Sequence, residues 1–434
     1  MFNEFFRYDG DQLMCEGIAA DELAGKFGTP LYVYSAGAFR KQYREIADSF
    51  SAVKPLVCYS IKSCSNLSIL KLLKEEGAAF DCVSKGEVMR ALKIGADPKT
   101  LVFAGVGKTE DEIEHALRVG ILMFNVESES ELTAISRVAA RRGVEAGIAL
   151  RLNPDVDPKT HKHISTGKRE SKFGIDIERA KASLKRIREL KNLRLKGVHL
   201  HIGSQITEND RHAEAIAKVV PFIKEVKAAD FPLEYINVGG GYGISYRGSE
   251  GLNITDFAAK MLPHIKETGL KMACEPGRYV SGNGGILLTR VIFDKPSGDK
   301  NFLIVDAAMN DLIRPAIYDA YHKIWPVQSE FAPDAEIAGD AGRVYDVVGP
   351  VCESTDVFAK ARRLPATNEG ELLAIFSAGA YGMAMSSTYN QRPRAAEVIV
   401  QGDKFWVARE RESIEDLIRG ERLTPREVFS AADL

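Results

Sequence analysis

The sequence predicts an α/β barrel followed by a second, mainly antiparallel β domain, and three observations indicate this arrangement. From about Pro55 to Gly277, short apolar segments alternate with longer amphipathic ones. After Arg278 the apolar segments are strand-like and are separated by Gly, Pro and Asp turns. The length of 434 residues suits two domains better than one small core. We therefore expect a (β/α)8, TIM-like barrel with a β-barrel or sandwich domain attached.

The barrel is expected from a series of apolar, β-branched segments that are separated by helical patterns. The predicted strands are Leu56–Ile61, Ala79–Val83, Leu101–Ala104, Met123–Val126, Gly147–Leu152, Val198–Ile202, Tyr235–Val238 and Lys271–Cys274. The predicted helices include Ser65–Glu76, Lys85–Ile94, Glu110–Val119 and Ser130–Arg142. Continuous apolar strands between helices indicate a parallel sheet that is covered by helices. Their number suits a closed barrel, but a doubly wound open sheet would give a similar pattern.

The rest of the chain is expected to form the β domain. Its predicted strands are Ile286–Phe293, Asn301–Val305, Arg343–Val348, Asp356–Ala359, Leu372–Phe376 and Glu397–Val407, with short helices near Pro315–His322 and Ile414–Arg419. We divide the chain into an N-terminal segment, 1–29, that packs with the β domain, a barrel, 30–277, and the C-terminal β domain, 278–434.

Composition favours a small-molecule partner. Lys plus Arg (58) nearly balance Asp plus Glu (60), so no strong field points to nucleic acid or to an anionic membrane. No apolar run reaches the roughly 18 to 20 residues of a spanning helix, and Met1–Gly10 lacks the apolar stretch of a secretory signal. A cytoplasmic location is expected. The six cysteines form no Cys-x-x-Cys pair, so we interpret them as reduced thiols.

The first chemical candidate is Lys62, which ends the apolar segment Tyr59-Ser60-Ile61-Lys62. In a parallel barrel the carboxyl ends of the strands carry the working groups. A lysine there would be partly desolvated, which would lower its pKa and make the amine nucleophilic. Pyridoxal phosphate requires such an amine. A solvated lysine at a strand end is the alternative.

Two further motifs follow predicted strands. His199 and His201 lie two residues apart in the stretch that ends with Ser204-Gln205, but no third ligand with suitable spacing follows, so a zinc site is disfavoured. A single imidazole could instead stack on a cofactor ring, and Ser204 could donate to a phosphate. The glycines of Val238-Gly239-Gly240-Gly241-Tyr242-Gly243 could bring backbone N–H groups close to an anion. A tight turn explains them equally well.

The remaining motifs lie at the end of the barrel and in the β domain. In Glu275-Pro276-Gly277-Arg278, the glutamate could keep a pyridine nitrogen protonated, while the glycine amide and the arginine could bind anions. A surface Glu–Arg pair is the alternative. The β domain contains Asn310 to Tyr318, then Cys352-Glu353-Ser354, then Gly379-Ala380-Tyr381-Gly382. Each of these could be ordinary loop sequence.

Together these motifs identify a resemblance. The chain resembles the alanine-racemase-like (fold type III) pyridoxal-phosphate enzymes, and within them the diaminopimelate decarboxylases, from about Pro30 to Val400. The matching blocks are YSIKS, FDCVSKGE, SKFGI, HLHIGSQ, NVGGGYG, EPGR, MNDLIRPAIY, CESTD and GAYGMAMSSTYNQRPR. The sequence departs from the family at Ser60-Ile61, Ser63-Cys64, Tyr242 and Thr355, and all of these residues are compatible with the same chemistry.

The resemblance implies a role for each matching residue. Lys62 holds the cofactor as a Schiff base, and Cys352, from the β domain of a second subunit, donates the proton, so that a homodimer completes each site. The implied cofactor-binding residues are Lys62, Asp81, His201, Ser204, Gly240, Gly241, Glu275, Gly277, Arg278 and Tyr381. His201 stacks on the ring, Glu275 pairs with its nitrogen, and Asp81 supports the lysine.

The same resemblance implies decarboxylation of meso-2,6-diaminopimelate, at its D-configured centre, to L-lysine and CO2, the last step of lysine biosynthesis. The implied substrate-binding residues are Arg278, Arg314, Tyr318, Glu353 and Tyr381. Arg314 would bind the distal carboxylate and Glu353 the distal ammonium. Two alternatives remain. One is a related decarboxylase of carboxynorspermidine, ornithine, arginine or a carrier-bound amino acid, and the other is a non-catalytic relative that binds the cofactor or a partner.

Overall fold

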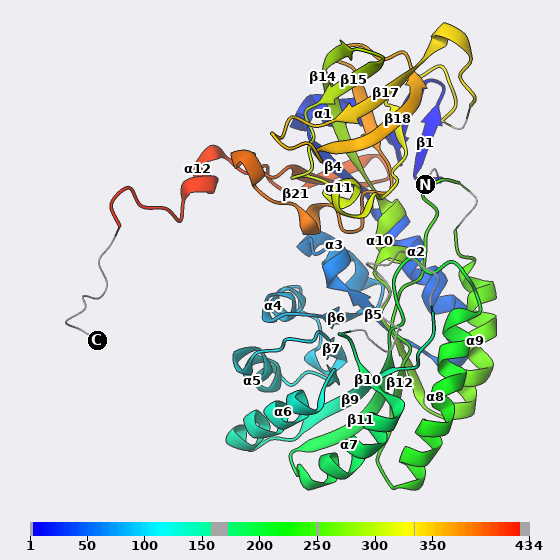
Figure 1. Cartoon of the computed structure of the whole chain (residues 1–434), viewed down its shortest axis with the longest axis vertical. Coiled ribbons are helices and arrows are strands. Elements are labelled where there is room, and N and C mark those ends of the chain that lie inside the picture. Colours follow the sequence, from blue (N-terminus) through cyan, green and yellow to red (C-terminus); the bar gives the residue numbers. More distant parts are fainter. Residues whose placement is uncertain (1–2, 158–171, 249–250, 334, 426–434) are drawn as a thin grey trace.

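The computed structural model describes residues 3–157, 172–248, 251–333 and 335–425. Figure 1 shows two bodies, with the parallel barrel and its helices below and a mixed β sheet above. The chain passes between the bodies at α2 (Ala36–Ser49) and at α10 (Arg278–Ser281), and these two helices pack against each other.

The lower body is a closed barrel of parallel strands. In spatial order these are β5 (Leu56–Ser60), β6 (Ala79–Cys82), β7 (Leu101–Phe103), β8 (Met123–Val126), β9 (Ala146–Asn153), β11 (Leu193–Leu200), β12 (Tyr235–Asn237) and β13 (Lys271–Cys274). The ring closes because β13 pairs with β5, and the short β10 (Ile175–Asp176) adds to one side of β9. The predicted barrel is confirmed, and the open-sheet alternative is excluded by this closure.

Helices on the outside of the barrel follow the predicted amphipathic stretches. They are α3 (Leu67–Glu75), α4 (Lys85–Lys93), α5 (Glu110–Val119), α6 (Glu129–Arg142), α7 (Ile177–Glu189), α8 (Arg211–Ala228) and α9 (Ile254–Thr268). Helix α5 shows why the boundaries fall where they do. Thr109 and Glu112 form a reciprocal capping box at its start, and Gly120 ends it with a left-handed φ of 76°.

The upper body is a mixed sheet. Its strands, in spatial order, are β18 (Val357–Pro365), β17 (Gly342–Val348), β15 (Lys300–Val305), β14 (Gly285–Ser297), β4 (Leu31–Ser35), β20 (Ala396–Gln401) and β21 (Lys404–Arg409), while β19 (Leu372–Ile375) pairs with β14 and with β16 (Ile324–Pro326). The pairs are antiparallel apart from β15–β17 and β4–β20. The short helix α11 (Arg314–Tyr318) packs against β18, whereas the short helix α12 (Ile414–Ile418) lies on a C-terminal extension that projects away from the sheet (Figure 1).

Three details differ from the predicted elements. Strand β4, within the range expected for the barrel, belongs to the upper sheet because it pairs with β14 and β20. The single strand expected over 397–407 is a hairpin, which turns at Gly402 with φ 60°. The helix expected over 315–322 ends at Tyr318, because Asp319 has a φ of 50° that no helix can continue.

The N-terminal residues form a small antiparallel sheet, β1 (Phe6–Asp9), β2 (Gln12–Cys15) and β3 (Ile18–Ala19), followed by α1 (Ala20–Phe27). The backbone N–H of Leu13 donates to Val327 O at 2.8 Å, and that of Gly17 donates to Gly402 O at 2.9 Å. These bonds join the segment to the upper body. The division of the chain into three parts remains our proposal, with β4 assigned to the upper sheet.

The interior holds large apolar side chains and most of the thiols. Phe103 and Phe124 stack inside the barrel body with ring centroids 6.0 Å apart. The six cysteines are free thiols, of which Cys352 is exposed and the others are buried. Within the described ranges, no helix has both the length and the apolar character needed to cross a lipid bilayer.

Candidate active site

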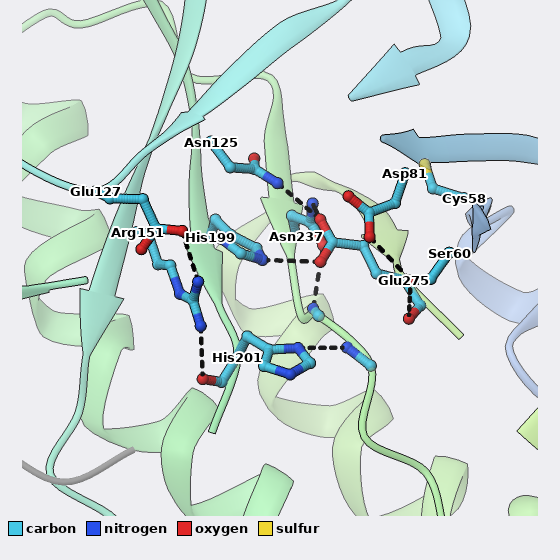
Figure 2. Close-up of polar contacts among 12 residues, drawn as sticks. Cys58, Ser60, Asp81, Asn125, Glu127, Arg151, His199, His201, Asn237 and Glu275 are labelled. Atoms are coloured by element: carbon cyan, nitrogen blue, oxygen red, sulfur yellow. Dashed lines mark hydrogen bonds and ion pairs between the residues drawn. The ribbon is translucent and has the colours of Figure 1, made fainter. Parts of the chain in front are cut away.

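The predicted site residues of the barrel meet where its strands end. Asp81 lies on β6, His199 on β11, and Glu275 directly after β13. Lys62 lies two residues beyond the end of β5, in the turn Ile61–Ser63. Figure 2 shows side chains from these separate strands converging on Glu275 at one end of the barrel. The closed parallel barrel brings the strand ends together, as expected for this fold.

Lys62 forms an ion pair with Asp81. Its Nζ lies 2.6 Å from Asp81 Oδ2, and the Asp81 side chain is fully buried. Ser60 Oγ lies 2.8 Å from the same carboxylate oxygen. Burial lowers the pKa of Lys62, but the carboxylates of Asp81 and Glu275 outweigh burial and raise the pKa above its usual value. The expectation of a lowered lysine pKa is therefore wrong for this arrangement, because it considered desolvation without the neighbouring charges.

Glu275 is held by three donors. Asn125 Nδ2 and Asn237 Nδ2 each donate to Oε1 at 2.7 Å, and His199 Nε2 lies 3.1 Å from Oε2. Burial alone would raise the pKa of Glu275, but His199 and Lys62 outweigh burial and lower it. The site thus keeps an anionic carboxylate in a buried position, where it can pair with a cationic group.

His201 has a fixed tautomer. Its Nδ1 accepts a hydrogen bond from the backbone N–H of Gly240 at 3.2 Å, so any proton of the neutral ring is on Nε2. Burial, together with the charge of Arg151, lowers the pKa of His201 well below its usual value. A neutral, planar imidazole is suited to stacking on an aromatic ring.

The glycine-rich segment is required by close backbone packing. A Cβ on Gly240 would lie 2.0 Å from Glu275 O, and one on Gly241 would lie 2.1 Å from Gly203 O. Gly277 is also confined, because a Cβ there would lie 3.1 Å from the Cβ of Ser63. The turn interpretation of these glycines is therefore sufficient to explain their residue type. Their closeness to an anion stays a prediction.

Arg278 links several predicted residues. Its Nη1 donates to the Tyr246 hydroxyl at 2.6 Å and its Nη2 to Ser204 Oγ at 3.2 Å. Its guanidinium lies 4.9 Å from the centre of the Tyr381 ring. Tyr381 has the uncommon φ of 56°, and its N–H donates to Ser63 O at 2.8 Å, next to Lys62. The structure thus joins the anion-binding candidates to the turn that carries the lysine.

A cavity of about 390 Å³ opens beside Arg278. Arg314 and Tyr318, both predicted to bind substrate, line it as well. Arg278 and Arg314 are only 7% and 6% exposed. Within the described part of the chain, neither guanidinium forms an ion pair with a carboxylate. The cavity is therefore ready to accept a negatively charged group.

Cys352 and Glu353 lie elsewhere. Both are exposed, and neither lines the cavity. The N–H of Cys352 donates to Asn390 Oδ1 at 2.8 Å, and both residues belong to the C-terminal part of the chain, which follows the barrel in sequence. Among the described residues of this one chain, the structure does not bring Cys352 or Glu353 to Lys62 or Arg314.

Sequence reasoning missed the residues that support the site from behind. Asn125 and Asn237 bind Glu275 but stood unremarked inside apolar strands. Arg151 Nη1 pairs with Glu127 Oε1 at 2.6 Å, both side chains are almost fully buried, and Arg151 Nη2 donates to the backbone oxygen of His201 (Figure 2). A polar side chain within an apolar strand is rarely buried without a partner, and that signal could have found Asn125, Arg151 and Asn237, whereas Glu127 lies just after β8.

Comparisons with known proteins agree with this geometry. The family model described as pyridoxal-dependent decarboxylase, pyridoxal binding domain, matches residues 36–282. A diaminopimelate decarboxylase of Pseudomonas aeruginosa is 45% identical over 97% of this chain and 99% of its own length. One of Aquifex aeolicus is 44% identical over 96% of this chain and 97% of its own length.

Solved structures give the same result. A diaminopimelate decarboxylase of M. jannaschii superposes with a TM-score of 0.90 at 35% identity, over 98% of this chain and 99% of that one. The enzyme of Helicobacter pylori, in complex with L-lysine, superposes with a TM-score of 0.86 at 41% identity, over 92% of this chain and 98% of that one. The chain therefore belongs to the pyridoxal-dependent decarboxylases, in the branch formed by the diaminopimelate decarboxylases.

Proposed function

We propose that this carboxy-lyase binds pyridoxal 5'-phosphate and decarboxylates meso-2,6-diaminopimelate to L-lysine and CO2, the last step of lysine biosynthesis. One observation carries the choice of substrate. Two buried guanidiniums, of Arg278 and Arg314, line a cavity without a carboxylate partner among the described residues. Burying an unpaired charge is costly, so we infer that a carboxylate of the ligand is their counter-ion.

The residues present fit pyridoxal phosphate. Lys62 supplies an amine for the aldehyde, and Glu275 supplies a buried anion for the ring nitrogen. Ser204, whose oxygen accepts from Arg278, supplies a hydroxyl donor for a phosphate. His201 supplies a neutral ring for stacking. Bound pyridoxal phosphate supplies the electron sink that stabilises the negative charge left when CO2 departs.

The chain's own residues set the proton positions. Glu275, kept anionic by His199, Asn125 and Asn237, would favour a proton on the ring nitrogen of the bound cofactor. Asp81 keeps Lys62 cationic while the amine is free. Together these carboxylates balance charge in a buried site, which favours the electron withdrawal that decarboxylation needs.

Charged side chains would recognise the distal end of the substrate. Diaminopimelate carries a carboxylate and an ammonium beyond its reacting centre. Arg314 would bind that carboxylate, Tyr318 would donate to it from the same helix, and Glu353 would accept from the ammonium. Ornithine, arginine and carboxynorspermidine lack this zwitterion, and a buried Arg314 without a counter-ion would penalise them.

A second copy of the chain is needed to complete this site. Cys352 is exposed and does not line the cavity of its own chain, yet its thiol is the proton donor that the family resemblance implies. We therefore propose a homodimer in which Cys352 and Glu353 of one subunit enter the site of the other. This proposal explains why both residues are solvent-exposed on the isolated chain.

The experiment that tests the function is CO2 release by purified protein supplied with pyridoxal phosphate. Meso-diaminopimelate is compared with ornithine, arginine, L-lysine and carboxynorspermidine at equal concentrations. We expect a strong preference for diaminopimelate, with L-lysine as the product. Preference for another amine would overturn the assignment of diaminopimelate as the substrate. Absence of turnover with every amine tested would favour a non-catalytic relative.

A further inference from the structure

Arg314, which lines the cavity, is held by the side chains of His322 and Tyr246. Arg314 Nη1 lies 2.8 Å from His322 Nε2, and its guanidinium carbon lies 5.0 Å from the centre of the Tyr246 ring. His322 is fully buried, and its ring meets the Tyr246 ring edge-on, with centroids 5.6 Å apart. The three side chains form one packed unit.

The hydrogen bonds of His322 fix its tautomer. Its Nδ1 lies 2.8 Å from the backbone oxygen of Phe376, which can only accept, so Nδ1 carries the proton. Nε2 therefore has a free lone pair and accepts from Arg314. Burial, reinforced by the positive charge of Arg314, lowers the pKa of His322 to about 3. The imidazole thus stays neutral at neutral pH, where a protonated ring would repel the guanidinium.

Tyr246 ties the two arginines of the cavity together. Its ring packs against Arg314, while its hydroxyl accepts from Arg278 Nη1 at 2.6 Å. Burial would raise the pKa of Tyr246, but Arg278 and Arg314 outweigh burial and lower it. The electron-rich ring face and the hydroxyl oxygen therefore offset some of the repulsion between two buried cations.

From this geometry we propose that His322 and Tyr246 are positioning residues, which hold Arg314 beside Arg278 so that both guanidiniums receive the distal carboxylate. The proposal rests on the proposed function and explains how the enzyme would select substrates that carry a distal carboxylate. Because the donors are fixed before the ligand binds, little ordering entropy is lost on binding. Neither residue needs to touch the reacting atoms.

The test compares two ligands that differ by one carboxylate, L-lysine and cadaverine. Their dissociation constants are measured by calorimetry on the enzyme loaded with pyridoxal phosphate. In His322→Phe the acceptor is lost and the ring is kept, so we expect L-lysine to bind about ten- to a hundredfold more weakly. Cadaverine affinity should be unchanged. His322→Gln, which restores an acceptor oxygen, should recover much of the L-lysine affinity.

Two further variants separate positioning from general damage. His115→Phe removes a comparable contact far from the site, where Arg118 Nη2 lies 2.7 Å from His115 Nδ1 on α5, and should leave both affinities unchanged. Tyr246→Leu removes the ring beneath Arg314 and should weaken L-lysine selectively, which keeps the test available if His322→Phe does not fold.

The outcomes distinguish this inference from the function on which it rests. Equal weakening of L-lysine and cadaverine in His322→Phe and Tyr246→Leu would show a merely structural role and overturn the inference. If the two variants bound both ligands as tightly as the wild type does, the inference would be overturned as well. The proposed function would still stand in that case, provided that the wild type prefers L-lysine to cadaverine. A wild type that binds both ligands equally would overturn the carboxylate site itself, and the proposed function with it.

Discussion

Replacing Arg314 by methionine should remove substrate recognition while leaving the chemistry intact. Arg314 is 6% exposed, lines the cavity of about 390 Å³ and has no carboxylate partner among the described residues. Methionine keeps an unbranched apolar stem in place of the arginine stem and carries no charge. The change therefore deletes the guanidinium and leaves Lys62, Glu275 and their hydrogen bonds as they are.

The size of the effect follows from the bonds that are lost. A guanidinium can make two parallel charge-assisted hydrogen bonds to one carboxylate. At about 1.5 to 3 kcal/mol each, the pair is worth about 3 to 6 kcal/mol. That loss corresponds to a decrease of about 10² to 10⁴ in kcat/KM for meso-diaminopimelate. D-lysine, which has the reacting centre but no distal carboxylate, should lose almost nothing.

The assay is CO2 release from both substrates by the wild type and by Arg314→Met. Arg247→Met is the matched control, because Arg247 lines the same cavity but is exposed and packs on the Tyr321 ring. It should change kcat/KM by less than about threefold, as expected for an exposed charge. An equal decrease for diaminopimelate and D-lysine in Arg314→Met would refute the reasoning, as would no decrease at all.

Further predictions concern the lysine, the cysteine and two buried histidines. Lys62→Ala should abolish turnover and the absorbance of bound cofactor, and near-normal activity would reject the assignment. Cys352→Ala should reduce turnover but retain cofactor. If subunits share sites, an equal mixture of the Cys352→Ala and Lys62→Ala variants should recover about a quarter of wild-type activity, because about half of the dimers are mixed and each mixed dimer has one intact site. No recovery in the mixture would contradict the shared site. His212 and His322 have folded pKa values of about 4 and about 3, below the unfolded value, so the unfolded chain takes up more protons between those values and about pH 6.5. Stability should therefore fall by about 2 kcal/mol per histidine between pH 7 and pH 5 in chemical unfolding, and a flat profile would show that these rings are accessible.

The barrel could be predicted because its strands are locally distinctive. A segment such as Leu101–Phe103 is a continuous apolar run between amphipathic helices, and only a parallel sheet buried on both faces explains that pattern. Strand β4 carries an equally apolar sequence. Its membership of the upper sheet depends on pairing with residues more than 250 positions away, and local pattern holds no information about such pairing.

The site could be predicted where its residues lie at the carboxyl ends of predicted strands. Lys62 and Glu275 were found because the ends of parallel strands meet, and the two groups lie close enough for the charge of Glu275 to raise the pKa of Lys62. Asp81 was expected to support the lysine, but the predicted direction of the pKa shift of Lys62 was wrong. The pKa of Lys62 is raised because Asp81 lies 2.6 Å away, a distance that depends on the register between β5 and β6.

The supports of the arginines were beyond sequence reasoning for a similar reason. His322 was expected inside a helix, but the chain leaves α11 at Asp319 and only then turns His322 toward Arg314. Tyr246 lies in a loop after the glycine-rich segment, without any periodic pattern. Such contacts depend on how two bodies of the chain pack together, and a single sequence does not specify that packing in a readable form.

The most direct test of the account is the release of CO2 from meso-diaminopimelate by the purified protein with added pyridoxal phosphate, with ornithine, arginine, L-lysine and carboxynorspermidine as competitors. The account predicts that diaminopimelate is strongly preferred and that L-lysine is formed in equal amount to CO2. Preferential turnover of a substrate without a distal carboxylate would contradict it, because Arg278 and Arg314 would then have no counter-ion.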